Sequence, residues 1–326
     1  MGKIPVAIVG AAGYTGVELI KLLLNHPNFE IGKLFGTSEG RIEEIYPGLE
    51  GVFNFPIEPA DIDEIAKFPL VFLAVPHKTA MGYVAPLRRR GVKIVDFSAD
   101  YRLQRANYEK FYCTHTDPFN LERAVYGLPE LFREEIKGAE LVANPGCYPT
   151  AALLGLAPFL EYLEEVFIDA KSGVSGAGKK VSEVTHFCNV DENFFPYNPA
   201  RHRHSIEIEE KSGLKVTFVP HLMPVNRGME VSIYGKLKEE IDPIPVAEGF
   251  YAGEEFIRIF NRPVSIKQVV GTHFCDIFAL RHRDNLYVNV VIDNLLRGAS
   301  SQALANGNLM FGFPEGLGLP KVGTLI

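Results

Sequence analysis

The stretch KIPVAIVGAAGYTGVELIKLLLNH, residues 3–26, contains the clearest signal for the fold. Residues 3–10 form a continuous β-rich apolar run, as expected for a strand that is buried on both faces. Residues 14–26 have the apolar spacing of a helix. Three glycines, Gly10, Gly13 and Gly16, lie at the turn between these elements. The stretch therefore predicts the first strand–turn–helix unit of an α/β domain.

The three glycines have the spacing G-x-x-G-x-x-G instead of the more common G-x-G-x-x-G. Glycine permits a tight turn and lets the backbone approach a pyrophosphate at the N-terminus of a helix. Because a buried strand precedes these glycines and an amphipathic helix follows them, the pattern indicates a dinucleotide site. The alternative is a strand–helix turn without a ligand.

The sequence GTSEGR, residues 36–41, follows the second predicted strand, where the ribose of a dinucleotide lies. NAD sites favour an acidic residue at this place. Thr37, Ser38 and Arg41 instead offer hydroxyls and a guanidinium, which suit the 2′-phosphate of NADP. Glu39 works against this interpretation, and a solvated loop is the alternative. The stretch favours NADP over NAD.

Strands and helices alternate through the N-terminal half of the chain, which implies βαβ units around a parallel sheet. After residue 147, strand-like runs dominate and indicate an α+β layout with an antiparallel or mixed sheet. The further elements predicted are strands over residues 29–36, 70–76 and 92–99, and helices over residues 79–91 and 298–312.

Length and composition exclude several classes of protein. The 326 residues are too many for one small core and predict two domains. A net charge of −7 carries no electrostatic footprint for nucleic acid. The glycine-broken N-terminus is not a secretory signal, and no apolar run is long enough to span a membrane. The cysteines form no C-x-x-C pair, which predicts free thiols in a reducing cytoplasm and neither a zinc site nor disulfides.

The sequence PGCYPT, residues 145–150, places Cys147 at the start of a predicted apolar helix. The free N–H groups and the positive dipole end of a helix stabilise a thiolate and make it a nucleophile. Gly146 leaves space for a substrate, and nearby N–H groups can hold an oxyanion. A buried structural cysteine is the alternative. Together with a nicotinamide, a nucleophilic thiol indicates reduction of an acyl group through a thioester.

Two other segments carry candidate residues. In SADYR, Ser98 and Arg102 follow a parallel strand and could bind phosphate, or they could belong to a surface ion pair. In RHRHSIE, a helix would put His204 and Glu207 on one face as an acid–base pair. His221 is the rival acid–base residue. Metal ligation by the histidines lacks a third ligand at a suitable spacing.

VANPGCYPTAALLGLAP, residues 142–158, resembles the active-site signature of the N-acetyl-gamma-glutamyl-phosphate reductase family, which is related to aspartate-semialdehyde dehydrogenase and glyceraldehyde-3-phosphate dehydrogenase. GAAGYTGVEL, AVPHKTA, DFSADYRL, YGLPE, SGVSGAGKK, RHRHSIEI, HLMPVNRGM and DNLLRGASSQA agree with that family in order, over nearly the whole chain. Ser205 and Ile206 stand where threonine and proline are common, and residues 306–308 vary a familiar tail.

The resemblance implies NADPH-dependent reduction of an acyl phosphate to a semialdehyde in arginine biosynthesis. It implies a Rossmann-type α/β domain over residues 1–146, completed by a C-terminal helix at about 300–326, and a glyceraldehyde-3-phosphate-dehydrogenase-like α+β catalytic and oligomerisation domain over 147–299. We expect a cytoplasmic homo-oligomer, a dimer or a tetramer, with no nucleic acid, membrane or metal partner. An aminoadipyl-phosphate reductase of lysine biosynthesis, a cysteine acyl-transferase without redox chemistry and a dinucleotide-sensing protein are the alternatives.

The candidate residues fall into three groups. The catalytic residues expected are Cys147, His204 and Glu207. The cofactor-binding residues expected are Gly10, Gly13, Tyr14, Thr15, Gly16, Thr37, Ser38, Arg41 and Asn306. The substrate-binding residues expected are Ser98, Arg102, Asn144, Ser175, Gly176 and His202. The SGVSGAGK loop that contains Ser175 and Gly176 could be a second phosphate nest or a bare turn.

Overall fold

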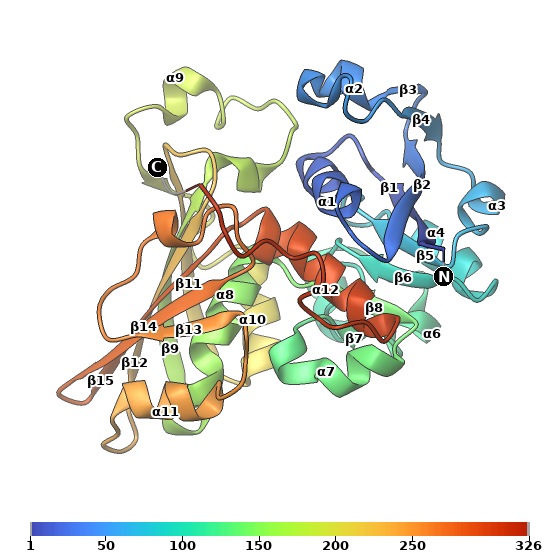
Figure 1. Ribbon diagram of the computed structural model, residues 1–326. Helices are drawn as coiled ribbons and strands as arrows, with labels where there is room; N and C mark the ends of the chain where they lie inside the picture. Colours follow the sequence, from blue (N-terminus) through green and yellow to red (C-terminus); the bar gives the residue numbers. More distant parts are fainter. Residues whose placement is uncertain (1, 325–326) are drawn as a thin grey trace. The chain divides into compact units, whose positions relative to one another are not determined.

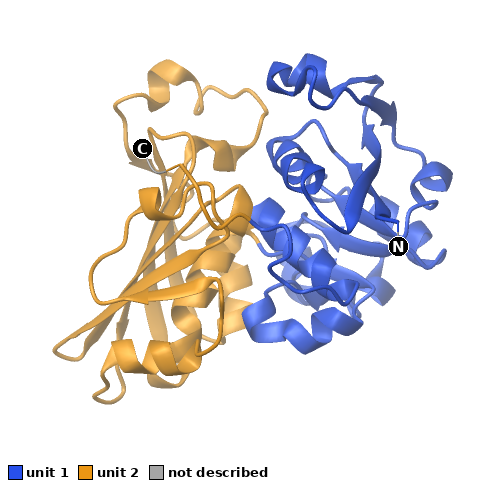
Figure 2. Ribbon diagram, in the orientation of Figure 1, with its two compact units in different colours: residues 1–145, 299–319 blue, residues 146–298, 320–326 orange. Residues whose placement is uncertain are grey.

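The computed structural model describes residues 2–324 (Figure 1). The chain crosses three times between two units (Figure 2). Unit 1 consists of Met1–Pro145 and Ala299–Leu319, and unit 2 consists of Gly146–Gly298 and Pro320–Ile326. The expected assignment of residues 300–326 to the first domain is wrong for residues 320–324. These residues belong to unit 2, where the Pro320 carbonyl accepts a hydrogen bond of 2.9 Å from the His273 N–H.

Unit 1 is built around a sheet with the strand order β3-β4-β2-β1-β5-β6-β8-β7. Neighbouring strands are parallel except for β3 and β4, as the alternating sequence predicts. The strands are β1 (Ile4–Val9), β2 (Phe29–Gly36), β3 (Gly40–Arg41), β4 (Pro56–Pro59), β5 (Leu70–Leu73), β6 (Lys93–Asp96), β7 (Val125–Tyr126) and β8 (Leu141–Ala143).

The apolar run at the N-terminus forms the strand β1, which lies between β2 and β5. Its last four residues are buried, since both faces of the sheet are covered. The helices of unit 1 are α1 (Tyr14–Leu24), α2 (Ile42–Ile45), α3 (Ile62–Ile65), α4 (Met81–Arg88), α5 (Arg105–Phe111), α6 (Pro118–Leu121), α7 (Pro129–Gly138) and α12 (Ser301–Met310). The last of these packs against α7, β6 and α1.

Unit 2 contains a mixed sheet with the strand order β10-β11-β9-β12-β15-β14-β13. β9 and β11 are parallel, as are β13 and β14, and the other neighbours are antiparallel. The strands are β9 (Glu165–Gly173), β10 (Phe195–Pro196), β11 (Lys215–Met223), β12 (Met229–Lys236), β13 (Ile257–Phe260), β14 (Cys275–His282) and β15 (Asn285–Ile292). The helices are α8 (Cys147–Leu156), α9 (Phe187–Val190), α10 (His204–Ser212) and α11 (Pro243–Phe250).

The helix α8 is the centre of unit 2. All of its residues after Cys147 are buried, because it packs on β12 and β15 on one side and on α10 on the other. A Cβ at Gly155 would lie 2.5 Å from Val290 and 3.0 Å from Ile233, so this helix lies close to the sheet. Within residues 2–324, no helix has the length and apolarity that a bilayer span requires.

Candidate active site

The turn between β1 and α1 fits the backbone of a dinucleotide site. Gly10 has φ +86°, and a Cβ there would lie 2.2 Å from the Ala74 carbonyl oxygen. A Cβ at Gly16 would lie 2.6 Å from the carbonyl oxygens of Gly10 and Ala11. The Gly13 N–H donates to the Gly10 carbonyl at 3.1 Å, and α1 begins at the next residue. Only glycine leaves the backbone this close to the start of the helix, as pyrophosphate binding requires.

The residues that are predicted to bind the 2′-phosphate of NADP lie beyond the end of β2. Thr37, Ser38 and Arg41 are exposed. The Arg41 guanidinium contacts the Glu43 carboxylate. The Arg41 side chain is about half exposed, whereas Glu43 is buried and also accepts a hydrogen bond from the Phe55 N–H at 3.0 Å. Binding of a 2′-phosphate by Arg41 therefore stays a prediction.

Asn306 lies on α12 inside unit 1 and is fully buried. Its Nδ2 donates to the Gly127 carbonyl and to the Asn144 Oδ1, both at 3.0 Å. Its buried Oδ1 has no hydrogen-bond partner among the described residues. An unsatisfied buried acceptor is costly, and a bound amide donor would remove that cost. This observation fits the expected dinucleotide. Asn144 donates in turn from its Nδ2 to the Ala299 carbonyl at 3.1 Å.

Cys147 is the first residue of α8, as predicted, and it is partly exposed. Gly146 is the N-cap residue, and its N–H donates to the Oε1 of Glu207 at 3.0 Å. Glu207 is only 1% exposed, although its carboxylate is a charged group. The buried carboxylate therefore ties the start of α8 to α10.

His204 is the first residue of α10 and lies beside Tyr148, which follows Cys147. Its ring centroid is 5.9 Å from that of Tyr148 and 4.7 Å from that of His202. The His204 N–H donates to the His202 Nδ1 at 3.1 Å. Burial lowers the pKa of His202 to about 4, and the nearby Arg203 charge contributes. His202 is therefore neutral at pH 7. The fold brings together the three predicted catalytic residues and His202.

His221, the rival acid–base residue, lies on the other face of the sheet. Strand residues alternate between faces, and Phe218 in β11 packs against Tyr148 of α8 at 5.2 Å. His221, three residues later, therefore lies opposite to α8. Its Nδ1 is 3.0 Å from the Asp169 Oδ1, and its ring stacks on Phe194. This placement favours His204 as the acid–base residue.

Ser98 and Arg102, predicted to bind phosphate, are both buried in unit 1. The Ser98 hydroxyl donates to the Asp96 carboxylate at 2.7 Å. The Arg102 guanidinium donates to the carbonyls of Asn144 at 2.7 Å and Phe97 at 2.6 Å. These contacts hold the segment after β6 against the end of β8. The phosphate-binding role of both residues stays a prediction and requires their burial to change.

Ser175 and Gly176 belong to a short turn after β9. The Ser175 hydroxyl accepts a hydrogen bond from the Asn294 Nδ2 at 3.0 Å, and its N–H donates to the Asn226 carbonyl at 3.1 Å. Gly176 is exposed. The turn is therefore anchored on one side and open on the other, which is compatible with the predicted substrate contact. Asn294 holds this turn through Ser175. The sequence did not predict that role, although Asn294 lies in the quoted motif DNLLRGASSQA.

Gly298 also lies at the site, although the sequence did not predict a role for it. A Cβ at this position would lie 2.7 Å from the Cβ of Cys147. Gly298 lies in a π-helical turn, Leu296–Ser300, and its N–H donates to the Asp293 carbonyl at 2.9 Å. Such turns are frequent at functional sites. The glycine in DNLLRGASSQA was the available signal, but sequence cannot reveal that a residue about 150 positions away packs on the nucleophile.

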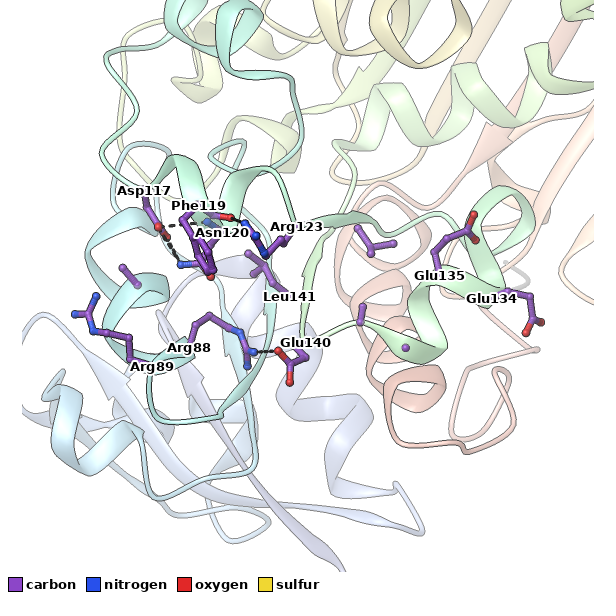
Figure 3. Close-up of a pocket in the computed structure, with 14 residues that line it drawn as sticks. Arg88, Arg89, Asp117, Phe119, Asn120, Arg123, Glu134, Glu135, Glu140 and Leu141 are labelled. Atoms are coloured by element: carbon purple, nitrogen blue, oxygen red, sulfur yellow. Dashed lines mark hydrogen bonds and ion pairs between the residues drawn. The ribbon is translucent and has the colours of Figure 1, made fainter.

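A separate cavity of about 890 Å³ lies in unit 1 between α4, α6 and α7 (Figure 3). Its wall includes Phe119, whose ring lies 3.7 Å from the Arg123 guanidinium, and the ion pair of Arg88 with Glu140. None of the predicted site residues lines this cavity. It is distinct from the candidate site.

Comparison with known families follows the division of the chain. Residues 5–139 match the model of the semialdehyde dehydrogenase NAD binding domain. Residues 147–294 match the model of the semialdehyde dehydrogenase dimerisation domain. The fold and the site thus define a semialdehyde dehydrogenase.

Relatives that match over nearly the whole chain identify the particular family within this class. An N-acetyl-gamma-glutamyl-phosphate reductase from Sulfurovum sp. is 54% identical over 331 residues and covers 98% of each chain. One from Methanocaldococcus jannaschii is 43% identical over 336 residues, again covering 98% of each chain. The chain belongs to the N-acetyl-gamma-glutamyl-phosphate reductase family.

Solved structures of similar fold are more distant in sequence. Aspartate semialdehyde dehydrogenase II from Vibrio cholerae has a TM-score of 0.73 at 17% identity and covers 95% of this chain and 99% of its own. Aspartate semialdehyde dehydrogenase with NADP from Candida albicans has a TM-score of 0.71 at 14% identity, covering 95% and 99%. These likenesses agree with the predicted fold class.

We predict that Gly298→Ala destabilises the protein by about 1–3 kcal/mol, the usual range for overpacking. The new Cβ would displace Cys147, so alkylation of its thiol by iodoacetamide should also change in rate. Thermal unfolding and alkylation kinetics measure both effects. Gly249→Ala on α11 is the control, because its Cβ would meet nothing within 4 Å. In a Cys147→Gly background the destabilisation should shrink, and an undiminished loss there would refute the contact.

Proposed function

We propose that this chain reduces N-acetyl-gamma-glutamyl phosphate to the semialdehyde and phosphate, with NADPH as the reductant and Cys147 as the nucleophile. Family membership over nearly the whole chain supports the reaction. The observation that carries the residue assignment is the Gly146 N–H to Glu207 contact of 3.0 Å, because it ties the nucleophile's helix to the helix that begins with His204.

The Cys147 thiolate attacks the carbonyl carbon of the acyl phosphate. An S–C bond forms, the C–O bond to the phosphate breaks, and phosphate leaves with that electron pair. The N–H groups at the start of α8 are the donors that would stabilise the carbonyl oxygen as it gains negative charge. NADPH, when bound, supplies the hydride that reduces the thioester.

Reduction of the thioester gives a hemithioacetal, and His204 moves the proton on its oxygen. The proton leaves that oxygen as the C–S bond breaks, so the aldehyde departs and the thiolate is restored. His202 is neutral at pH 7 and lies 4.7 Å from His204 between ring centroids, so it adds no competing positive charge. Glu207 is a positioning residue, because its carboxylate accepts a hydrogen bond from the Gly146 N–H and so fixes the start of α8.

The residues that would hold NADP are those of the glycine turn in unit 1, together with Tyr14, Thr15, Thr37, Ser38, Arg41 and Asn306. The crowded backbone at Gly10 and Gly16 and the unsatisfied Oδ1 of Asn306 support this assignment. The match to an NAD binding domain disfavours a cofactor-free acyl-transferase. The relatives' shared name disfavours an aminoadipyl substrate.

The chain forms homo-oligomers, dimers or tetramers, through the outer face of the unit 2 sheet, and acts in the cytoplasm. Cross-strand neighbours on that face form an apolar row of Phe167, Tyr234, Tyr287 and Leu280. Phe167 is 55% and Tyr234 45% exposed, although both are large and apolar. The match to a dimerisation domain supports a second copy as their cover.

Cys147→Ser should leave the fold and NADP affinity intact but lower turnover to below about a thousandth of the wild-type rate. The reason is that serine at this position has no base strong enough to ionise its hydroxyl. Steady-state assays with NADPH and the acyl phosphate measure this, and alkylation of the wild-type enzyme should inactivate it unless substrate is present. A near-normal rate for Cys147→Ser would exclude the mechanism.

His204→Asn should lower kcat by about 10²- to 10⁴-fold and remove one limb of the pH–rate profile. The cause is the loss of the group that moves the proton. His221→Asn is the matched control, since His221 lies on the opposite face of the sheet and should leave the shape of the profile unchanged. If the two variants behave the other way round, His221 is the acid–base residue.

Tyr234→Glu should weaken the oligomer, because it places a charge in the apolar row. Size-exclusion chromatography with light scattering over a range of protein concentrations measures the effect. Val52→Glu is the control, as Val52 is 74% exposed but lies in unit 1. An unchanged mass for Tyr234→Glu at every concentration would place the interface elsewhere.

A further inference from the structure

Lys78 has an unusual backbone for a residue with a side chain. It lies between β5 and α4 with φ +72°, in the left-handed region that favours glycine. Residues with side chains adopt this conformation rarely, and such strain gathers at ligand sites. A glycine here would remove the strain. The presence of lysine therefore requires an explanation.

A buried carboxylate holds the strained turn in place. Asp100 is fully buried, and its two oxygens accept hydrogen bonds from the N–H groups of Lys78 at 2.7 Å and Ala80 at 3.0 Å. The Tyr108 hydroxyl donates to the same carboxylate at 2.8 Å. Charge-assisted hydrogen bonds of this kind are strong enough to offset the strain. The position of Lys78 is thus fixed by the core of unit 1.

The turn lies where ligands bind in sheets of this type. The chain runs from β1 to β2 on one side, whereas β5 pairs with β1 on the other. In such sheets the ligand lies outside the carboxyl ends of the strands, at the point where the strand order reverses. The Gly10 turn follows β1 at this point, and the loop after β5 packs on it, because a Gly10 Cβ would lie 2.2 Å from the Ala74 oxygen.

Lys78 brings an uncommitted positive charge to this place. It is exposed, and within residues 2–324 its ammonium group forms no ion pair or hydrogen bond. On the basis of the function proposed above, we propose that Lys78 binds a phosphate group in the crevice between the loops that follow β1 and β5. A lysine ammonium acts there as a point charge for phosphate oxygens. The phosphate belongs to the dinucleotide or to the acyl phosphate.

Lys78→Gly, Lys78→Arg and the control Lys67→Ala test this proposal in the full-length enzyme. Glycine adopts φ +72° without strain, so Lys78→Gly should fold with equal or greater thermal stability while losing the charge. Lys67 is another exposed lysine of unit 1 and pairs with Glu64 on the surface. NADPH affinity is measured by fluorescence titration without substrate. The KM for inorganic phosphate is measured in the reverse reaction.

We expect Lys78→Gly to weaken the binding of either NADPH or inorganic phosphate about 10-fold, because the variant loses one charge-assisted hydrogen bond. Weaker NADPH binding assigns the phosphate to the dinucleotide, and a higher KM for phosphate assigns it to the acyl phosphate. Lys78→Arg should retain most of the affinity. Wild-type values for Lys78→Gly in both measurements would overturn the proposal. The NADPH titration needs no turnover, so this outcome differs from a failure of the Cys147 mechanism.

Discussion

The hydrogen bond from the Gly146 N–H to the buried Glu207 carboxylate is the contact on which the site in unit 2 depends. Gly146 caps α8, which begins with Cys147, and Glu207 lies in the first turn of α10, which begins with His204. One contact of 3.0 Å therefore links the helix that begins with Cys147 to the helix that begins with His204. Because Glu207 is 1% exposed, losing this partner would leave a buried charge poorly satisfied. The arrangement is thus strongly constrained.

In each unit, one glycine without a side chain permits a close backbone contact. The backbone of Gly298 packs on the Cβ of Cys147, and the backbone of Ala74 packs on Gly10. In each case an added methyl group would force the packed segments to move. Cys147 and the glycine turn after β1 are therefore positioned by close backbone contact, which tolerates no added volume.

The sequence predicted the elements whose signal is local. The apolar run of β1, the glycine turn and the helix α1 all follow from residues 3–26, and β2 has the predicted bounds. The three helices between residues 105 and 138 were not predicted. α5 and α6 are short, and each is held by a buried polar contact with a residue outside the helix: Tyr108 with Asp100, and Asp117 with Tyr101. Such contacts leave no periodic pattern in the sequence.

Residue types and spacing were enough to predict the α/β start, a cysteine at a helix N-terminus and the family. These features depend on residue types within one short segment, where spacing and chemistry suffice. The positions of His204 and His221 required the tertiary structure, because they depend on which face of β11 each neighbour packs against. The tertiary structure was also needed to show that Gly298 packs against the Cβ of Cys147 and that the Asp100 carboxylate accepts a hydrogen bond from the Lys78 N–H. Contacts between residues far apart in the chain arise when strands and helices pack, and no local pattern encodes their distances.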